Sequence, residues 1–183
     1  GNPLRVRRPI AELAAKGQVI EIAEKIGNFE RLAGIVEADL ATLDPDKIPH
    51  DWRDSMVTGW LEFGFADAQK QVVSLVGELA VTLDAVCQRC LEPFRLSLAT
   101  GLRLLPTTVE QGVSAGNDFE PWELEDERVC PAEIVEEVLI MAMPLSAMHE
   151  NSAACKGYEP ADEEAQQTTR PFAALKAQLD QDK

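Results

Sequence analysis

The alternation of apolar and polar residues is most regular in the middle of the chain. Residues 56–65, 71–86 and 93–105 place Val, Leu or Phe at most alternate positions, with mixed residues between them. This period of two is typical of strands that are buried on one face of an antiparallel sheet. Short turns separate the three segments, so the pattern predicts a sheet built around a long hairpin, residues 71–105.

Helical periodicity is clearest in residues 131–143. Pro131 suits the first helical position, Pro144 ends the helix, and an apolar stripe recurs at helical spacing. The glutamates at the start of this segment, Glu136 among them, are explained by the positive end of the helix dipole.

Weaker patterns flank these elements. We expect a helix at residues 9–16 ended by Gly17, a short strand at 18–22, and a second helix at 28–36 with Asn28 as its cap. The composition of three further segments predicts a surface loop at 43–54, a loop at 107–117 and an acidic edge strand at 118–128.

Together these elements predict an α+β fold. An antiparallel β-sheet with a long central hairpin would be packed by helices from the N-terminal segment and from the C-terminal half. Residues 1–155 would form a single domain with a Cys/His metal clamp. Residues 156–183 would be an acidic flexible tail with a short terminal helix beginning near Arg170.

Composition narrows the class of protein. Hydrophobic residues make up 45% of 183 residues, which supports a core, and no apolar run is long enough to cross a membrane. The basic N-terminal residues are not followed by the apolar stretch of a signal peptide, so we expect a cytoplasmic protein with reduced cysteines. The net charge of −15 repels nucleic acid at long range; it suits a basic partner or simply maintains solubility.

Candidate chemistry is concentrated at Cys87-Gln88-Arg89-Cys90, on the predicted turn of the hairpin. Cys87 and Cys90 have the spacing that places two thiolates on one ion, and His149 with Cys155 can supply the other half of a tetrahedron. Zinc is the cofactor that this set favours. The alternative is four ordinary groups: reduced thiols and an exposed imidazole.

Two catalytic alternatives are weaker. A thiol oxidoreductase would place its Cys-x-x-Cys at a helix N-terminus, whereas no helical pattern follows Cys90. A cysteine nucleophile paired with His149 has no further support. No phosphate-binding loop, serine motif or paired-carboxylate signature is present, so we expect no enzyme and no small-molecule substrate.

Basic residues on the hairpin define a candidate nucleic-acid surface. Arg89 lies at the predicted tip, and Arg95 and Arg103 are separated by an even number of residues, so they share one face of a strand. Such a patch can contact RNA phosphates despite the acidic total charge; an ordinary solvated hairpin surface is the alternative.

The block Cys87-Gln88-Arg89-Cys90-Leu91-Glu92-Pro93-Phe94 resembles the central motif of the YceD family, the large ribosomal RNA subunit accumulation proteins. Three later blocks agree in order: the acidic-apolar segment 134–144, the pair His149 and Cys155, and residues 171–176. Two departures are Ser146-Ala147-Met148, where another proline is expected, and residues 37–54, which resemble an insertion.

The resemblance implies a non-catalytic ribosome-biogenesis factor that promotes accumulation of large-subunit (23S) ribosomal RNA. Its expected partners are a large-subunit rRNA precursor or a basic ribosomal protein, with no membrane. The resemblance also strengthens the zinc hypothesis, since all four candidate ligands match recurrent positions. The first alternative is an acidic interaction adaptor without RNA contact, and the second is a Cys-x-x-Cys oxidoreductase.

Overall fold

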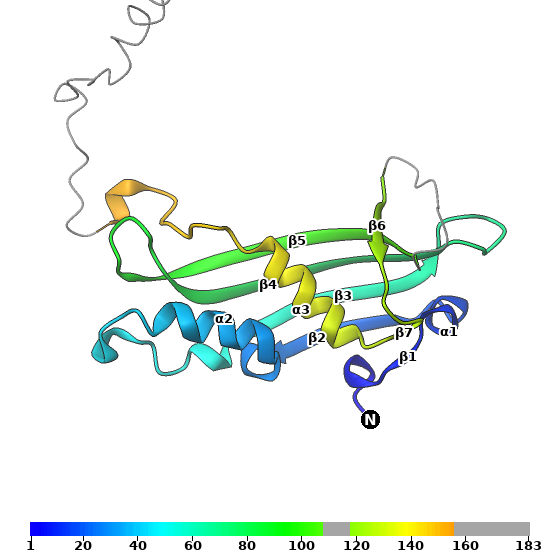
Figure 1. Ribbon diagram of the computed structural model, residues 1–183, viewed down its shortest axis with the longest axis horizontal. Coiled ribbons are helices and arrows are strands. Elements are labelled where there is room, and N and C mark those ends of the chain that lie inside the picture. Colours follow the sequence, from blue (N-terminus) through cyan, green and yellow to red (C-terminus); the bar gives the residue numbers. More distant parts are fainter. Residues whose placement is uncertain (108–117, 156–183) are drawn as a thin grey trace, which may run out of the picture.

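The structure is a computed structural model that describes residues 1–107 and 118–155. A five-stranded sheet has the order β2-β3-β4-β5-β6 (Figure 1). Its strands are Val19–Lys25 (β2), Met56–Phe65 (β3), Val73–Val86 (β4), Pro93–Thr107 (β5) and Glu120–Glu123 (β6). A separate two-stranded ribbon pairs Arg8–Pro9 (β1) with Arg128–Val129 (β7). The long hairpin formed by β4 and β5 is confirmed.

Neighbouring strands of the main sheet are antiparallel from β2 to β5, whereas β6 pairs with β5 in the parallel direction. The fold class is therefore confirmed with one correction, because the acidic edge strand joins in the other sense. Strand β6 runs in the same direction as β5, beside Leu104–Thr107.

Three α-helices pack on the sheet: Ile10–Ala15 (α1), Glu30–Leu40 (α2) and Pro131–Ala142 (α3). They contact β3, β4 and β5 respectively (Figure 1). The core lies between these helices and the sheet, with Leu61, Phe63 and Leu75 fully buried. On the opposite sheet face, Glu21, Thr58 and Glu78 are among the exposed side chains. Within the described residues, no helix is both long enough and apolar enough to cross a membrane.

The prediction for α2 was wrong in its position and its cap. The helix begins at Glu30, after Phe29, and the Asn28 side chain instead donates a hydrogen bond to Glu24. The cap comes from α3: Oε1 of buried Glu136 accepts the backbone N–H groups of Arg31 and Leu32, at 2.6 and 2.9 Å. A carboxylate at a helix N-terminus satisfies free N–H groups and the helix dipole. Glu136 thus stabilises α2 and not the start of its own helix.

The predicted surface loop at 43–54 also needs correction. It contains two 3₁₀ turns, Pro45–Lys47 and Trp52–Asp54, and it buries Leu43 and Trp52 in the core. This segment therefore combines turn-forming residues with apolar residues that are buried in the core. The predicted loop at 107–117 (beyond Thr107), the flexible tail and its terminal helix lie outside the described residues.

Candidate metal centre

The turn between β4 and β5 forms one half of the candidate site. The backbone N–H of Cys87 donates to the carbonyl of Glu92 at 2.9 Å, and that of Leu91 donates to the carbonyl of Cys87 at 2.8 Å. Leu91 adopts a φ of 59°, an uncommon conformation for a residue with a side chain. These bonds close a tight turn in which Cys87 is buried and Cys90 is half-buried.

The segment after α3 supplies the other half. Pro144 interrupts the helix, and the chain then passes along the hairpin tip, where the N–H of Gln88 donates to the carbonyl of Ala147 at 2.8 Å. The His149 ring packs on Phe94 of β5, with ring centroids 4.7 Å apart. A short 3₁₀ turn, Ser152–Ala154, then leads to buried Cys155. This path brings residues about sixty positions apart together, as the sequence predicted.

The four predicted ligand atoms converge. Sγ of Cys87 lies 3.9 Å from Sγ of Cys155, and Nδ1 of His149 lies 3.4 Å from Sγ of Cys155 and 3.7 Å from Sγ of Cys90. All four atoms lie within 4.8 Å of one another. For a tetrahedral zinc ion with Zn–S bonds of about 2.3 Å, neighbouring sulfurs stand about 3.8 Å apart. The Cys₃His cluster therefore has the donor set and the size for such an ion.

The electrostatics of the cluster favour a thiolate at Cys87. Burial raises the pKa of its thiol, but backbone hydrogen bonds from Cys90, His149 and Arg89 outweigh burial and lower the pKa to about 5. In contrast, the pKa of Cys155 is raised, first by burial and then by the neighbouring Cys87 and Cys90. Metal ligation requires the thiolate, and a cation inside the cluster would favour deprotonation of the remaining thiols.

Other groups fix the hairpin tip against α2 and the loop that follows it. Asp39, at the end of α2, accepts the N–H of Val86 at 2.8 Å, and Lys47 pairs with Glu92 of the turn at 2.7 Å. The roles of Asp39 and Lys47 could not be predicted from the sequence, because only the folded chain places α2 beside the hairpin tip. Cys130, the fourth cysteine, lies apart from the cluster, with its Sγ 3.6 Å from the carbonyl of Leu4.

The three candidate RNA-binding arginines do not converge. Arg89 lies against the cluster, with its guanidinium 3.9 Å from both Sγ of Cys155 and Sδ of Met148. Arg95 pairs with Asp84 at 3.2 Å, and Arg103 donates to the carbonyl of Asp118 and stacks on the ring of Phe119. Arg95 and Arg103 share a face of β5, but eight residues of strand put them about 26 Å apart.

Comparison with known proteins shows a family match that covers the cluster residues. The family model described as large ribosomal RNA subunit accumulation protein YceD matches residues 75–179, a span that includes most of the hairpin, α3 and all four cluster residues. The large ribosomal RNA subunit accumulation protein YceD of Haemophilus influenzae is 33% identical over 129 residues, which cover 67% of this chain and 72% of that protein. No solved structure matches the chain.

Proposed function

Because the chain belongs to the YceD family of large ribosomal RNA subunit accumulation proteins, we propose that it is a non-catalytic ribosome-biogenesis factor. It promotes accumulation of large-subunit rRNA in the cytoplasm by binding a component of the assembling subunit. The observation that carries the proposal is the Cys₃His cluster, which lies within the matched residues and ties the long hairpin to the segment after α3.

We propose zinc as the resident ion, held by Cys87, Cys90, His149 and Cys155. With four protein ligands, the ion has no open position for water or substrate, which is the arrangement of structural rather than catalytic sites. Its contribution is a cross-link that holds the segment around Ala147 and Met148 against the hairpin tip. The protein supplies the thiolates, the imidazole and the surrounding hydrogen bonds.

The partner in this proposal is a large-subunit rRNA precursor or a basic ribosomal protein. RNA contact would use Arg89, Arg95 and Arg103, the cationic side chains of the hairpin. Arg89→Glu should then weaken binding to precursor rRNA, and the difference should diminish as salt is raised, because phosphate contacts release counterions. Unchanged binding at low salt would remove Arg89 from the RNA surface. The net charge of −15 favours the basic protein as partner.

Ribosomal RNA levels test the proposal directly. Cells depleted of the protein should show a reduced ratio of large-subunit to small-subunit rRNA, and the wild-type chain should restore it. Cys90→Ser should restore it poorly, because three ligands hold zinc less tightly than four. Cys130→Ser is the matched control, since that thiol lies outside the cluster. A normal rRNA ratio in depleted cells would reject the proposed function.

The thiol oxidoreductase alternative has its own assay. Reduction of insulin with dithiothreitol exposes catalytic dithiols, and the proposal predicts no acceleration by the zinc-loaded protein. Acceleration that disappears in Cys87→Ser would favour redox catalysis instead.

A further inference from the structure

Among the described residues, no strand pairs with the outer edge of β5 over most of its length. Strand β6 pairs only with Leu104–Thr107, at the end of β5. In residues 94–103, backbone groups alternately point toward β4 and away from it. Among residues 1–107 and 118–155, no backbone group pairs with the outward-pointing ones.

Features that usually protect a free edge are absent between Arg95 and Arg103. The intervening residues 96–102 contain no Lys and no Pro. Soluble proteins usually cover or interrupt edges of this length, because unpaired N–H and C=O groups are a template for another strand. Strand addition at such an edge is also an established way of binding extended peptides.

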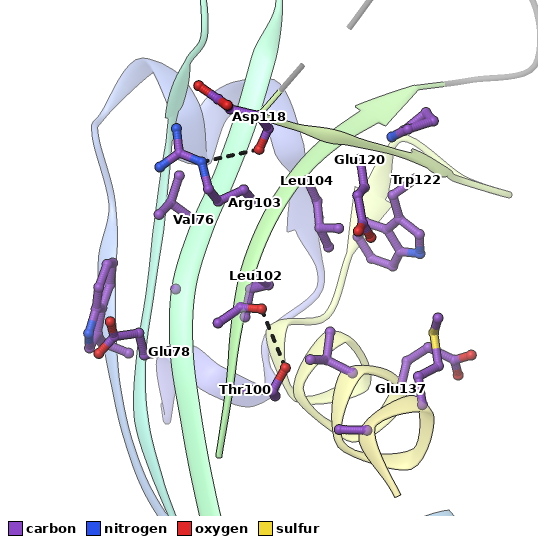
Figure 2. Close-up of a pocket in the computed structure, with 17 residues that line it drawn as sticks. Val76, Glu78, Thr100, Leu102, Arg103, Leu104, Asp118, Glu120, Trp122 and Glu137 are labelled. Atoms are coloured by element: carbon purple, nitrogen blue, oxygen red, sulfur yellow. Dashed lines mark hydrogen bonds between the residues drawn. The ribbon is translucent and has the colours of Figure 1, made fainter. Parts of the chain in front are cut away.

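Side chains on both faces of the sheet at this edge line a groove with a volume of about 650 Å³ (Figure 2). On one side, α3 contributes Val138, Met141 and Ala142, and Met141 is 75% exposed although it is apolar. On the other side of the sheet lie Glu78 and Trp60. The outer face is therefore an acidic, aromatic wall formed by Glu78 and Trp60, whereas the helix side combines apolar side chains with Glu120, Trp122 and Glu137.

Gly101 connects the edge to the acidic wall. The pairing register places Trp60, Glu78 and Gly101 in one row across β3, β4 and β5. A Cβ built on Gly101 would have only one neighbour within 4 Å, the carbonyl of Gly77 at 3.9 Å, so packing does not require glycine there. A glycine inside a strand often marks the close approach of a ligand or another backbone. Here it leaves an open path from the edge to Glu78.

We propose that the edge of β5 receives an extended segment of a basic protein, in which apolar residues alternate with Lys or Arg. In an added strand, successive side chains point to opposite faces. The apolar side chains would lie against α3, beside Val138 and Met141. A basic side chain opposite Gly101 would extend across it to Glu78 and the Trp60 ring, where ion pairing and cation–π attraction combine. This inference deepens the proposed function, on which it rests only for the partner being a ribosomal protein.

Charge selects this occupant over two others. Of the groove's carboxylates, Glu78 and Glu120 have no ion-pair partner among the described residues, while Glu137 pairs with Arg31. The one basic lining residue, Arg103, already donates to the Asp118 carbonyl and stacks on Phe119. RNA would bring phosphates to these carboxylates. A second copy of the chain would bring another net charge of −15.

The test uses the zinc-loaded full chain and a labelled synthetic peptide of about ten residues, matching the free edge, in which Lys alternates with Val. A peptide of the same composition with its Lys and Val residues in separate blocks is the control. We expect the alternating peptide to bind more tightly by fluorescence anisotropy. Its binding should also slow deuterium exchange of amides within residues 94–103.

Two variants locate the site. Gly101→Val closes the path to Glu78 without straining the strand, and Glu78→Lys reverses the charge at its end; each should weaken peptide binding by about tenfold or more. Glu62→Lys, an equal charge reversal on the same sheet face but on β3 and outside the groove, is the matched control and should bind like the wild type. Urea unfolding should show that all three variants are folded.

Equal binding of both peptides, absence of protection at residues 94–103, or full binding by Gly101→Val would overturn the proposal. A dimer whose protected amides lie in β5, or displacement of the peptide by an RNA oligonucleotide, would also overturn it by giving the edge another occupant. These results are independent of rRNA levels in depleted cells, so the proposed function can stand if the docking edge fails.

Discussion

The hydrogen bonds of Glu136 give a quantitative prediction about how α2 and α3 are joined. Its side chain is 8% exposed, and one oxygen, Oε1, accepts two backbone N–H groups at the N-terminus of α2. Glu136→Ala removes a helix cap, which costs about 0.5–2 kcal/mol, and also removes the favourable charge at the helix dipole, worth up to about 2 kcal/mol in a partly buried setting. We expect the free energy of unfolding to fall by about 2–4 kcal/mol.

Glu136→Gln separates these two contributions. The amide oxygen of glutamine can accept both N–H groups at the position of Oε1, so this variant loses the charge but keeps the cap. It should therefore lose only about 1 kcal/mol. Glu133→Ala is the control, because Glu133 is exposed on the same helix and forms a surface ion pair with Arg7, of a kind worth at most about 1 kcal/mol.

The assay is urea unfolding of the zinc-loaded protein, followed by circular dichroism at neutral pH. The order of stability should be wild type, then Glu136→Gln, then Glu136→Ala, with similar slopes against urea. If Glu136→Ala were no less stable than Glu133→Ala, the bonds to Arg31 and Leu32 would not be the main tie between the two helices.

Three further predictions follow from the glycines, a salt bridge and the thiols. Gly59→Ala should destabilise the protein by more than about 3 kcal/mol, because the added Cβ would clash with the Glu78 carbonyl and Gly59 has a φ of +145°. Gly34→Ala in α2 should instead stabilise the protein by about 0.5–1 kcal/mol in the same urea assay, because the added Cβ would have no neighbour within 4 Å. Hydrogen bonding by Arg5 lowers the pKa of Glu24 below 4.5, so the contribution of Glu24 to stability should be present above pH 4.5 and lost as the pH falls through the lowered value. The difference in stability between wild type and Glu24→Gln should therefore close over that range. A difference that stays constant would contradict the assignment. Thiol titration of the native zinc-loaded protein should detect at most Cys130, and titration after chelation and unfolding should detect all four thiols. Four reactive thiols before chelation would exclude zinc ligation by the cluster.

The sequence predicted the strands of the hairpin because their two faces differ in polarity at every second residue. Met56–Phe65 was predicted with its observed bounds, and α3 within one residue, since Pro131 and Pro144 bracket it. The four cluster residues could be grouped because Cys-x-x-Cys on a turn is a moderately specific pattern and His149 with Cys155 offered the other two donors; the family resemblance then supported all four. Their convergence is what the structure adds.

Long-range partners account for what the sequence did not predict. The cap of α2 comes from Glu136, more than a hundred residues later, so local capping preferences pointed to Asn28 instead. The direction of β6 depends on how the chain reaches the sheet edge, which local periodicity does not encode. The arginines looked free in the sequence, but Arg95 and Arg103 each have an intramolecular partner that only the fold reveals.

Ultraviolet crosslinking of the tagged protein in cells, with identification of both RNA and protein partners, tests the central claim most directly. We predict that the recovered molecules belong to the large subunit, as precursor rRNA, a basic ribosomal protein or both. RNA crosslinks would place the contact on the arginine-bearing hairpin, and protein crosslinks without RNA would place it on the acidic groove beside β5. Recovery of neither large-subunit rRNA nor a large-subunit protein would contradict the account.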